Sequence, residues 1–204
     1  MSPNGLSAVR ADIRHYFHVH QAHSLAAKAH VLCQSPGLWA LMLYRFGRSL
    51  RSRPAAGARL GRILYAVGYQ LMCRLTHICL PLDAVVGERV WLGAHGPIIV
   101  SPLASIGPGC ALYGGTTLGI AGRGADRGAP QLEANVTVCP GASIIGPTTV
   151  PAGVVVGPNS VVTRKVEGGS TWFGVPARAT YGSPRFLPSR RLTHVPFPGS
   201  LNAT

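Results

Sequence analysis

A small aliphatic residue recurs at every sixth position through the second half of this 204-residue chain. Six residues suffice for one short strand and one corner, so three such units close a triangular coil whose aliphatic side chains point inward. The repeat therefore predicts a left-handed parallel β-helix, and the recurring aliphatic residues are its internal anchors. They are Leu80, Val86, Leu92, Val100, Ile106, Leu112, Leu118, Leu132, Val138, Ile144, Val150, Val156 and Val162.

Glycine and proline follow the anchors closely, as in Ile106-Gly107-Pro108-Gly109. Tight corners need such residues, because glycine tolerates positive φ and proline fixes a turn. The 26 glycines show no period of three, which excludes a collagen-like chain.

The six-residue spacing breaks twice, and an insertion in a coil must leave it as a loop. Leu92 and Val100 are eight residues apart, which predicts a bulge at 93–97 that carries His95. Leu118 and Leu132 are fourteen apart, which predicts a glycine-rich, cationic projecting arm at 119–131.

Before Leu80 the apolar spacing becomes helical, so we expect an α+β chain with an N-terminal helical region, residues 1–79, before the β-helix, residues 80–180. Two or three helices are expected across about residues 5–78, with a start at Ser35-Pro36 and a break at 51–54. Arg62 and Arg74 interrupt the apolar stretch that ends at Leu82, which favours a packed amphipathic helix and no membrane span. Residues 181–204 form a Pro/Arg-rich tail that we expect to be extended or disordered.

The formal net charge is +13, with only six acidic residues. A polyanionic partner is one explanation, and an arginine-rich proteome is another. No recognition helix or stacking platform indicates nucleic acid, whereas a phosphate-rich cofactor such as coenzyme A needs only a few cations. The five cysteines lack metal-site spacing and are expected to be small buried residues of a reduced chain. No secretion signal stands at the N-terminus, so a cytoplasmic location is expected.

Several motifs occur in the order typical of one enzyme family: the hexads, the histidine bulge before 98–100, the arm after Thr116-Thr117-Leu118-Gly119, and the closing 174–178. Upstream, residues 36–45 look like that family's helical segment. Over residues 8–180 the chain resembles the serine acetyltransferases. It is also similar to their relatives that acetylate sugars in capsule and exopolysaccharide synthesis.

The resemblance implies direct acetyl transfer from acetyl-CoA to an acceptor hydroxyl. A histidine would act as general base, and backbone N–H groups at the corners would stabilise the oxyanion. His95 is the candidate base because no other histidine lies in the β-helix. The resemblance also implies a homotrimer or a dimer of trimers, with active sites between neighbouring β-helices.

For the cofactor, exposed backbone donors and cations late in the coil point to seven residues. These are Gly141, Ala142, Arg164, Lys165, Gly174, Pro176 and Arg178. Arg127 in the arm is a candidate contact for an acceptor carboxylate. Five histidines gather between His15 and His30, but no cysteine or carboxylate completes a metal motif, so no metal is expected.

The chain departs from the serine acetyltransferase pattern at the site itself. A gapless alignment places the family's catalytic histidine at Ala94, and its second histidine at Ala129. The arm segment Gly128-Ala129-Pro130 is instead common in the sugar-acetylating relatives. Three interpretations stay open: an O-acetyltransferase acting on serine, the same chemistry on a sugar, polysaccharide precursor or secondary metabolite, and a catalytically impaired β-helix scaffold.

Overall fold

The computed structural model describes residues 6–51, 55–93 and 96–180. Four helices come first: α1 (Leu6–Val19), α2 (Leu25–Gln34), α3 (Pro36–Arg51) and α4 (Ala55–Thr76). The expectation of two or three helices was therefore too low, because the segment before Ser35 forms two helices of its own. Ser24 caps α2 by accepting a hydrogen bond from Ala27 N, and Pro36 occupies the first turn of α3, where it is tolerated.

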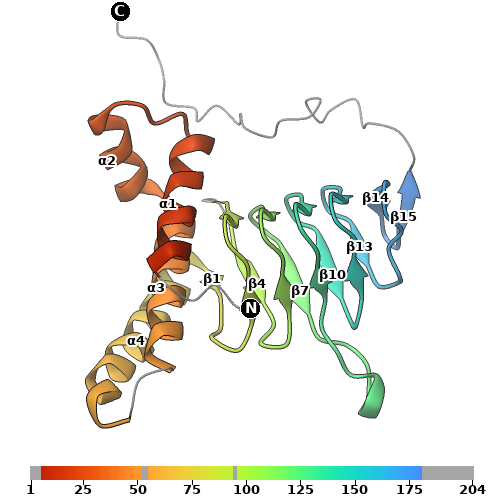
Figure 1. Cartoon of the computed structure of the whole chain (residues 1–204). Helices are drawn as coiled ribbons and strands as arrows, with labels where there is room; N and C mark the ends of the chain where they lie inside the picture. The colour runs from red at the N-terminus through yellow and green to blue at the C-terminus, as the bar shows by residue number, and fades with distance from the viewer. Residues whose placement is uncertain (1–5, 52–54, 94–95, 181–204) are drawn as a thin grey trace, which may run out of the picture.

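Short parallel strands follow the helices and wind into coils (Figure 1). They are β1 (Ile78–Cys79), β2 (Val85–Val86), β3 (Trp91–Leu92), β4 (Ile98–Val100), β5 (Ser105–Ile106), β6 (Ala111–Leu112), β7 (Thr117–Gly119), β8 (Gln131–Leu132), β9 (Thr137–Val138), β10 (Ser143–Ile145), β11 (Thr149–Val150), β12 (Val155–Val156), β13 (Val161–Val162), β14 (Thr171–Gly174) and β15 (Ala177–Thr180). Up to β13, every third strand returns to the same sheet, which gives one sheet of β1, β4, β7, β10 and β13 and one of β2, β5, β8 and β11. The third sheet contains β3, β6, β9, β12 and β14, all parallel, and ends with β15, which pairs antiparallel with β14. This is the topology of a parallel β-helix with three faces.

The strand register confirms both insertions. Ser143 pairs with Val161, eighteen residues on, as three hexads require. Ile78 pairs with Ile98, twenty residues on, because the bulge adds two residues. Thr117 pairs with Ser143, twenty-six residues on, because the arm adds eight, and the arm leaves the coil as a projection (Figure 1).

Two positions in each hexad face the core. The predicted anchors are all at most 4% exposed, so the inward ladder is confirmed. The residue two places before each anchor is also buried, which the sequence analysis did not predict. The members of this second ladder that are at most 1% exposed are Ile78, Ala84, Val90, Ile98, Ala104, Cys110, Thr116, Val136, Ala142, Val154 and Ser160.

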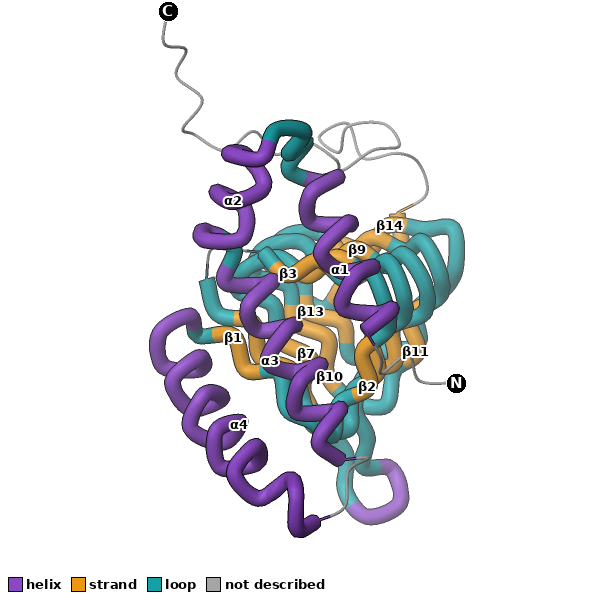
Figure 2. The backbone as a smooth tube through the Cα atoms, turned by 60° about the vertical axis from the view of Figure 1, so that its left-hand side comes forward, coloured by secondary structure: helices purple, strands orange, loops and turns teal. Residues whose placement is uncertain are grey.

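The helices lie across the end of the coil where the first strands are (Figure 2). The Tyr16 hydroxyl accepts a hydrogen bond from Leu92 N at 2.9 Å and donates one to Leu92 O at 3.1 Å. Gly37 of α3 lies against the same backbone, where a Cβ would meet the Tyr16 hydroxyl at 2.7 Å and Leu92 Cβ at 2.8 Å. The helical region thus holds the residue that immediately precedes the histidine bulge.

Two half-buried histidines, His15 in α1 and His20 just after it, make the fold sensitive to acid. Burial lowers the pKa of His15, with help from His18 and Arg89, and burial lowers the pKa of His20, with help from His30. Below about pH 6.5 the unfolded chain therefore binds more protons than the folded one, and stability is lost as the pH falls through the lower folded pKa values.

We accordingly expect the urea midpoint to fall between pH 7.5 and pH 5.5, and to fall less in a His15→Gln/His20→Gln variant. His23→Gln, at an exposed position after this helix that influences neither histidine, is the matched control. An unchanged pH dependence in the double variant would mean that these histidines do not cause it.

Candidate functional site

The histidine bulge leaves the coil at the edge between the sheet that contains β3 and the sheet that contains β4. We call this the bulge edge; it comprises 93–97, 113–115, 139–141, 157–159 and Gly174 in successive coils. Its corners are hydrogen-bonded from one coil to the next: Gly115 N donates to Pro97 O at 2.6 Å, Gly141 N to Gly114 O at 3.1 Å, and Asn159 N to Pro140 O at 2.9 Å. His95 and Ala94 lie outside the described residues. The structure therefore describes Gly93 and Gly96 on either side of them, but not the imidazole.

Close approach between coils explains the glycines of this edge. A Cβ at Gly93 would lie 3.2 Å from Gly114 N, and Gly96 has a φ of +94°. Gly115 has a φ of +83°, and a Cβ there would lie 2.9 Å from Gly141 N. The glycines therefore let neighbouring coils stack closely at this edge. The side chains that remain at its described corners are those of Pro97, Tyr113, Cys139, Pro140, Pro158 and Asn159.

Two aromatic residues form a wall beside the bulge, and no sequence pattern predicted that they would meet. Trp91 and Tyr113 face outward from β3 and from the corner after β6, with ring centroids 4.7 Å apart and planes inclined by 59°. The Trp91 indole N–H is buried and finds no hydrogen-bond partner within the part of the chain that the structure describes. Burial raises the pKa of the neighbouring Cys139 to about 11, so this thiol stays protonated near neutral pH and is a poor nucleophile.

The arm leaves the next edge, between the sheets of β7 and β8, which we call the arm edge (101–104, 119–131, 146–148 and 163–165). Ala121 and Gly128 exchange backbone hydrogen bonds at 3.0 and 2.9 Å, and a 3₁₀ turn, Gly124–Asp126, forms the tip. Gly128 lies on Pro147, where a Cβ would come within 2.6 Å of the proline ring. Arg127 is exposed, whereas Ala129 is buried against the coil.

The predicted cofactor residues fall on both edges. Gly141 and Gly174 belong to the bulge edge, and Pro176 follows Gly174 after the cis peptide bond from Val175. Arg164 belongs to the arm edge, where its carbonyl accepts a hydrogen bond from Thr148 Oγ1, and Lys165 is exposed beside it. Arg178 is exposed on β15, in register with Phe173.

Several backbone donors of this set are already used within the chain. Gly141 N donates to Gly114 O, Ala142 N to Cys139 O at 3.2 Å, and Gly174 N to Ser160 Oγ at 3.1 Å. The Ala142 side chain points into the core. The backbone N–H groups of Gly141, Ala142 and Gly174 are thus satisfied within the chain and are not spare donors for a ligand.

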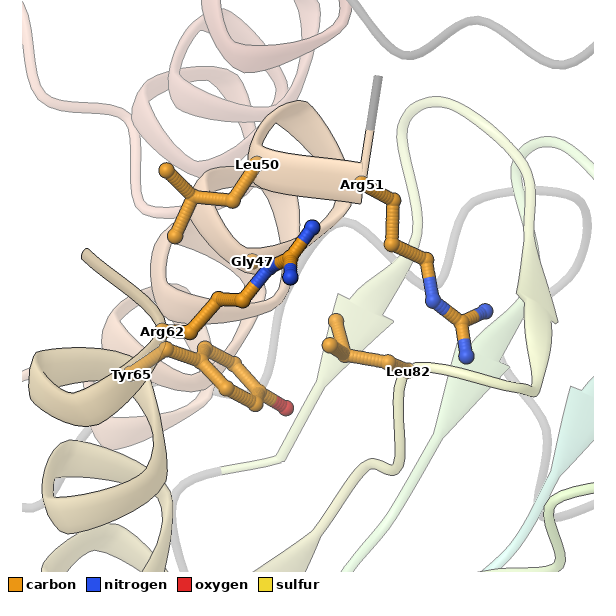
Figure 3. A pocket seen from close by; sticks show the side chains of 6 residues that line it. All are labelled: Gly47, Leu50, Arg51, Arg62, Tyr65 and Leu82. Carbon is orange, nitrogen blue, oxygen red and sulfur yellow. The ribbon is translucent and has the colours of Figure 1, made fainter. Parts of the chain in front are cut away.

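Other candidate sites lie away from these edges. A hollow of about 340 Å³ opens between α3 and α4, lined by Gly47, Leu50, Arg51, Arg62, Tyr65 and Leu82, none of them a predicted site residue (Figure 3). Within the described ranges, no three histidine, cysteine, aspartate or glutamate side chains come together as a metal site. No described helix is long and apolar enough to cross a membrane.

Comparison with known proteins links this geometry to one family. No family model matches the chain. The serine acetyltransferase of Helicobacter pylori is 30% identical over 151 residues, which are 74% of this chain and 85% of the relative. Those of Synechococcus elongatus and Mycobacterium tuberculosis are 29% and 27% identical, over 75% and 85% of this chain and 60% and 72% of their own length.

Solved structures show the same fold. A serine acetyltransferase in complex with CoA superposes with a TM-score of 0.68 at 26% identity, over 85% of this chain and 68% of the other. The serine acetyltransferase of Neisseria gonorrhoeae gives a TM-score of 0.71 at 23% identity, over 88% and 66%. The chain spans 60% of the length of the Synechococcus relative, so it shares the repeat and the adjoining helices with only part of that protein.

Proposed function

The chain belongs to the serine acetyltransferase family, and we propose that it is an acetyl-CoA-dependent O-acetyltransferase. The observation that carries the proposal is the bulge edge. A histidine-bearing insertion leaves the coil there, beside glycine-rich corners and an aromatic wall. A relative solved with CoA shares this fold, which supports acetyl-CoA as the co-substrate.

In the proposed reaction the acceptor oxygen attacks the thioester carbonyl while the His95 imidazole takes the hydroxyl proton. The tetrahedral intermediate collapses with cleavage of the C–S bond, and the CoA sulfur leaves with the proton that His95 held. Imidazole suits both transfers because its pKa lies near neutrality. Transfer is direct, and Cys139, held as a thiol, is not an acyl carrier.

The distribution of candidate residues over two edges favours an oligomeric site. Gly141, Gly174 and Pro176 lie at or next to the bulge edge, whereas Arg127, Arg164 and Lys165 lie at the arm edge of the same chain. A homotrimer of left-handed β-helices, or a dimer of such trimers, would bring the bulge edge of one chain beside the arm edge of its neighbour. Coenzyme A would then lie between them, with Arg164, Lys165 and Arg178 toward its phosphates, in a cytoplasmic enzyme.

The acceptor is a small molecule with a hydroxyl group, and serine is the first candidate by family. The arm favours a sugar or related metabolite as the second candidate. Ala129 stands where the serine enzymes have their second histidine, and it is buried against the coil. Arg123 and Arg127 flank the 3₁₀ turn at the arm tip. Arg127 is the proposed acceptor contact.

Thiol release from acetyl-CoA tests the function. The full chain is incubated with acetyl-CoA and either serine or a panel of hydroxylated sugars, and free CoA is measured with a thiol reagent. We expect acceptor-dependent release, with serine or with one class of sugar. No release with any acceptor, and no acetyl-CoA binding by calorimetry, would leave the scaffold interpretation.

A further inference from the structure

Helix α4 is apolar on two faces, and only one of them is packed. Gly61, Tyr65 and Gly68 lie toward α3, where they contact Leu50, Gly47 and Leu43 respectively. The outward face carries six large aliphatic side chains, each 56–71% exposed: Leu60, Ile63, Leu64, Val67, Leu71 and Leu75. Spacings of three and four residues place them on one side of the helix. The expectation that this helix is simply packed was therefore only half right.

Helix α3 also carries exposed apolar side chains. Trp39, Met42 and Phe46 are 38–44% exposed and follow one another at helical spacing, on the side away from the buried Leu41 and Tyr44. Helix α4 lies at the outer side of the helical layer, with α3 between it and α1 (Figure 2). Six exposed aliphatic side chains gathered on one face of a helix indicate a partner that covers it.

Charge restricts the choice of partner. Between Asp12 and Asp83 the sequence has no acidic residue and nine cations: Arg14, Lys28, Arg45, Arg48, Arg51, Arg53, Arg59, Arg62 and Arg74. Arg74 lies within the outward face of α4, three residues after Leu71, and Arg59 lies beside it, four residues before Ile63. Arg62 instead reaches into the hollow between α3 and α4 (Figure 3).

A second copy of this face is a poorer partner, because the face carries two cations and no carboxylate with which a copy could pair them. An anionic lipid surface supplies the opposite charge and also an apolar interior for the aliphatic side chains. We propose that the outward face of α4, together with Trp39, Met42 and Phe46, docks the protein on an anionic lipid bilayer. The helix lies in the plane of the interface and does not cross it.

Vesicle co-sedimentation tests this with the full chain at low and at physiological salt. Binding is expected to vesicles of phosphatidylcholine with phosphatidylglycerol, and at least tenfold weaker to phosphatidylcholine alone or at high salt. Leu64→Gln/Leu71→Gln should weaken binding more than tenfold. Arg59→Gln/Arg74→Gln should weaken it roughly 25-fold, at about fivefold per cation.

Val85→Gln/Leu103→Gln is the matched control, because both side chains are similarly exposed but lie on the coil. It should bind vesicles as the unchanged protein does, and circular dichroism confirms that each variant is folded. Equal binding by all variants, or no binding to anionic vesicles, overturns the proposal. So does a smaller mass by light scattering for the Leu64→Gln/Leu71→Gln variant with unchanged vesicle binding, since the face would then join copies of the chain.

Discussion

Replacement of His95 by alanine is expected to reduce acetyl transfer by about 10²–10⁴-fold, the range typical for loss of a positioned general base. The loss should fall on kcat, with little change in the KM for acetyl-CoA, because the imidazole is proposed to act on the acceptor proton. In the unchanged protein, kcat/KM should fall with decreasing pH as a single histidine is protonated, and this limb should disappear in the variant. Steady-state kinetics from pH 5.5 to 8.5 measure both.

Two variants separate a catalytic role from a structural one. His30→Ala, at an exposed position of α2, should retain full activity. Ala94→His/His95→Ala moves the imidazole to the position that a gapless alignment gives the family's histidine, and we expect it to recover a substantial part of the lost activity. Full activity in His95→Ala would exclude His95 as the base, whatever acceptor is used.

The β-helix was predictable because one rule governs every coil. The anchors share a residue type and a period, so each additional anchor strengthens the prediction that the chain is a repeat. The second inward ladder was missed because its members share no residue type: isoleucine, valine, alanine, cysteine, threonine and serine occupy equivalent places there. Such residues look alike inside and outside a strand, and their burial follows from the coil geometry alone.

The site was predicted less completely than the fold. Counting strands in threes would already have separated Gly141 from Arg164, since the corners after β9 and after β13 belong to different edges. No sequence pattern predicted the Trp91–Tyr113 pair. These two aromatic residues are twenty-two positions apart, and they become neighbours because the bulge shifts the pairing of β3 with β6 by two residues. The contacts between helices and coil follow no repeat: Tyr16 and Leu92 are 76 residues apart in the sequence.

The largest stability effect is expected at the buried ion pair that joins α1, α3 and the first coil. Arg45 Nε donates to Asp12 Oδ2 at 3.1 Å, and both side chains are about 2% exposed. The same guanidinium donates to Val86 O at 3.0 Å and to Gly87 O, while Arg89 N donates to Asp12 Oδ1 at 2.7 Å. Burial raises the pKa of Asp12, and the guanidinium opposes that shift, so the carboxylate depends on Arg45 for its charge.

Arg45→Met should therefore cost about 3–5 kcal/mol, the range for removing one partner of a buried pair, because Asp12 and two carbonyls lose their donor. Arg51→Met is the control on the same helix. Its ion pair with Asp83 spans 2.5 Å, but the side chains are 51% and 60% exposed, so its loss should cost about 1 kcal/mol or less. Urea unfolding at one fixed protein concentration compares the two, since assembly would otherwise shift the midpoint.

The position of the ion pair gives the test a second readout. Strand β3 begins two residues after Arg89, and Tyr16, one turn after Asp12 on α1, holds Leu92 just before the bulge. Loss of Arg45 should therefore release α1 from the first coil and speed hydrogen exchange at Trp91 and Leu92, while the later coils keep their protection because a repeat protein is held together by neighbouring contacts. Equal destabilisation by Arg45→Met and Arg51→Met, or faster exchange spread evenly along the coil, would show that the buried pair does not position the bulge.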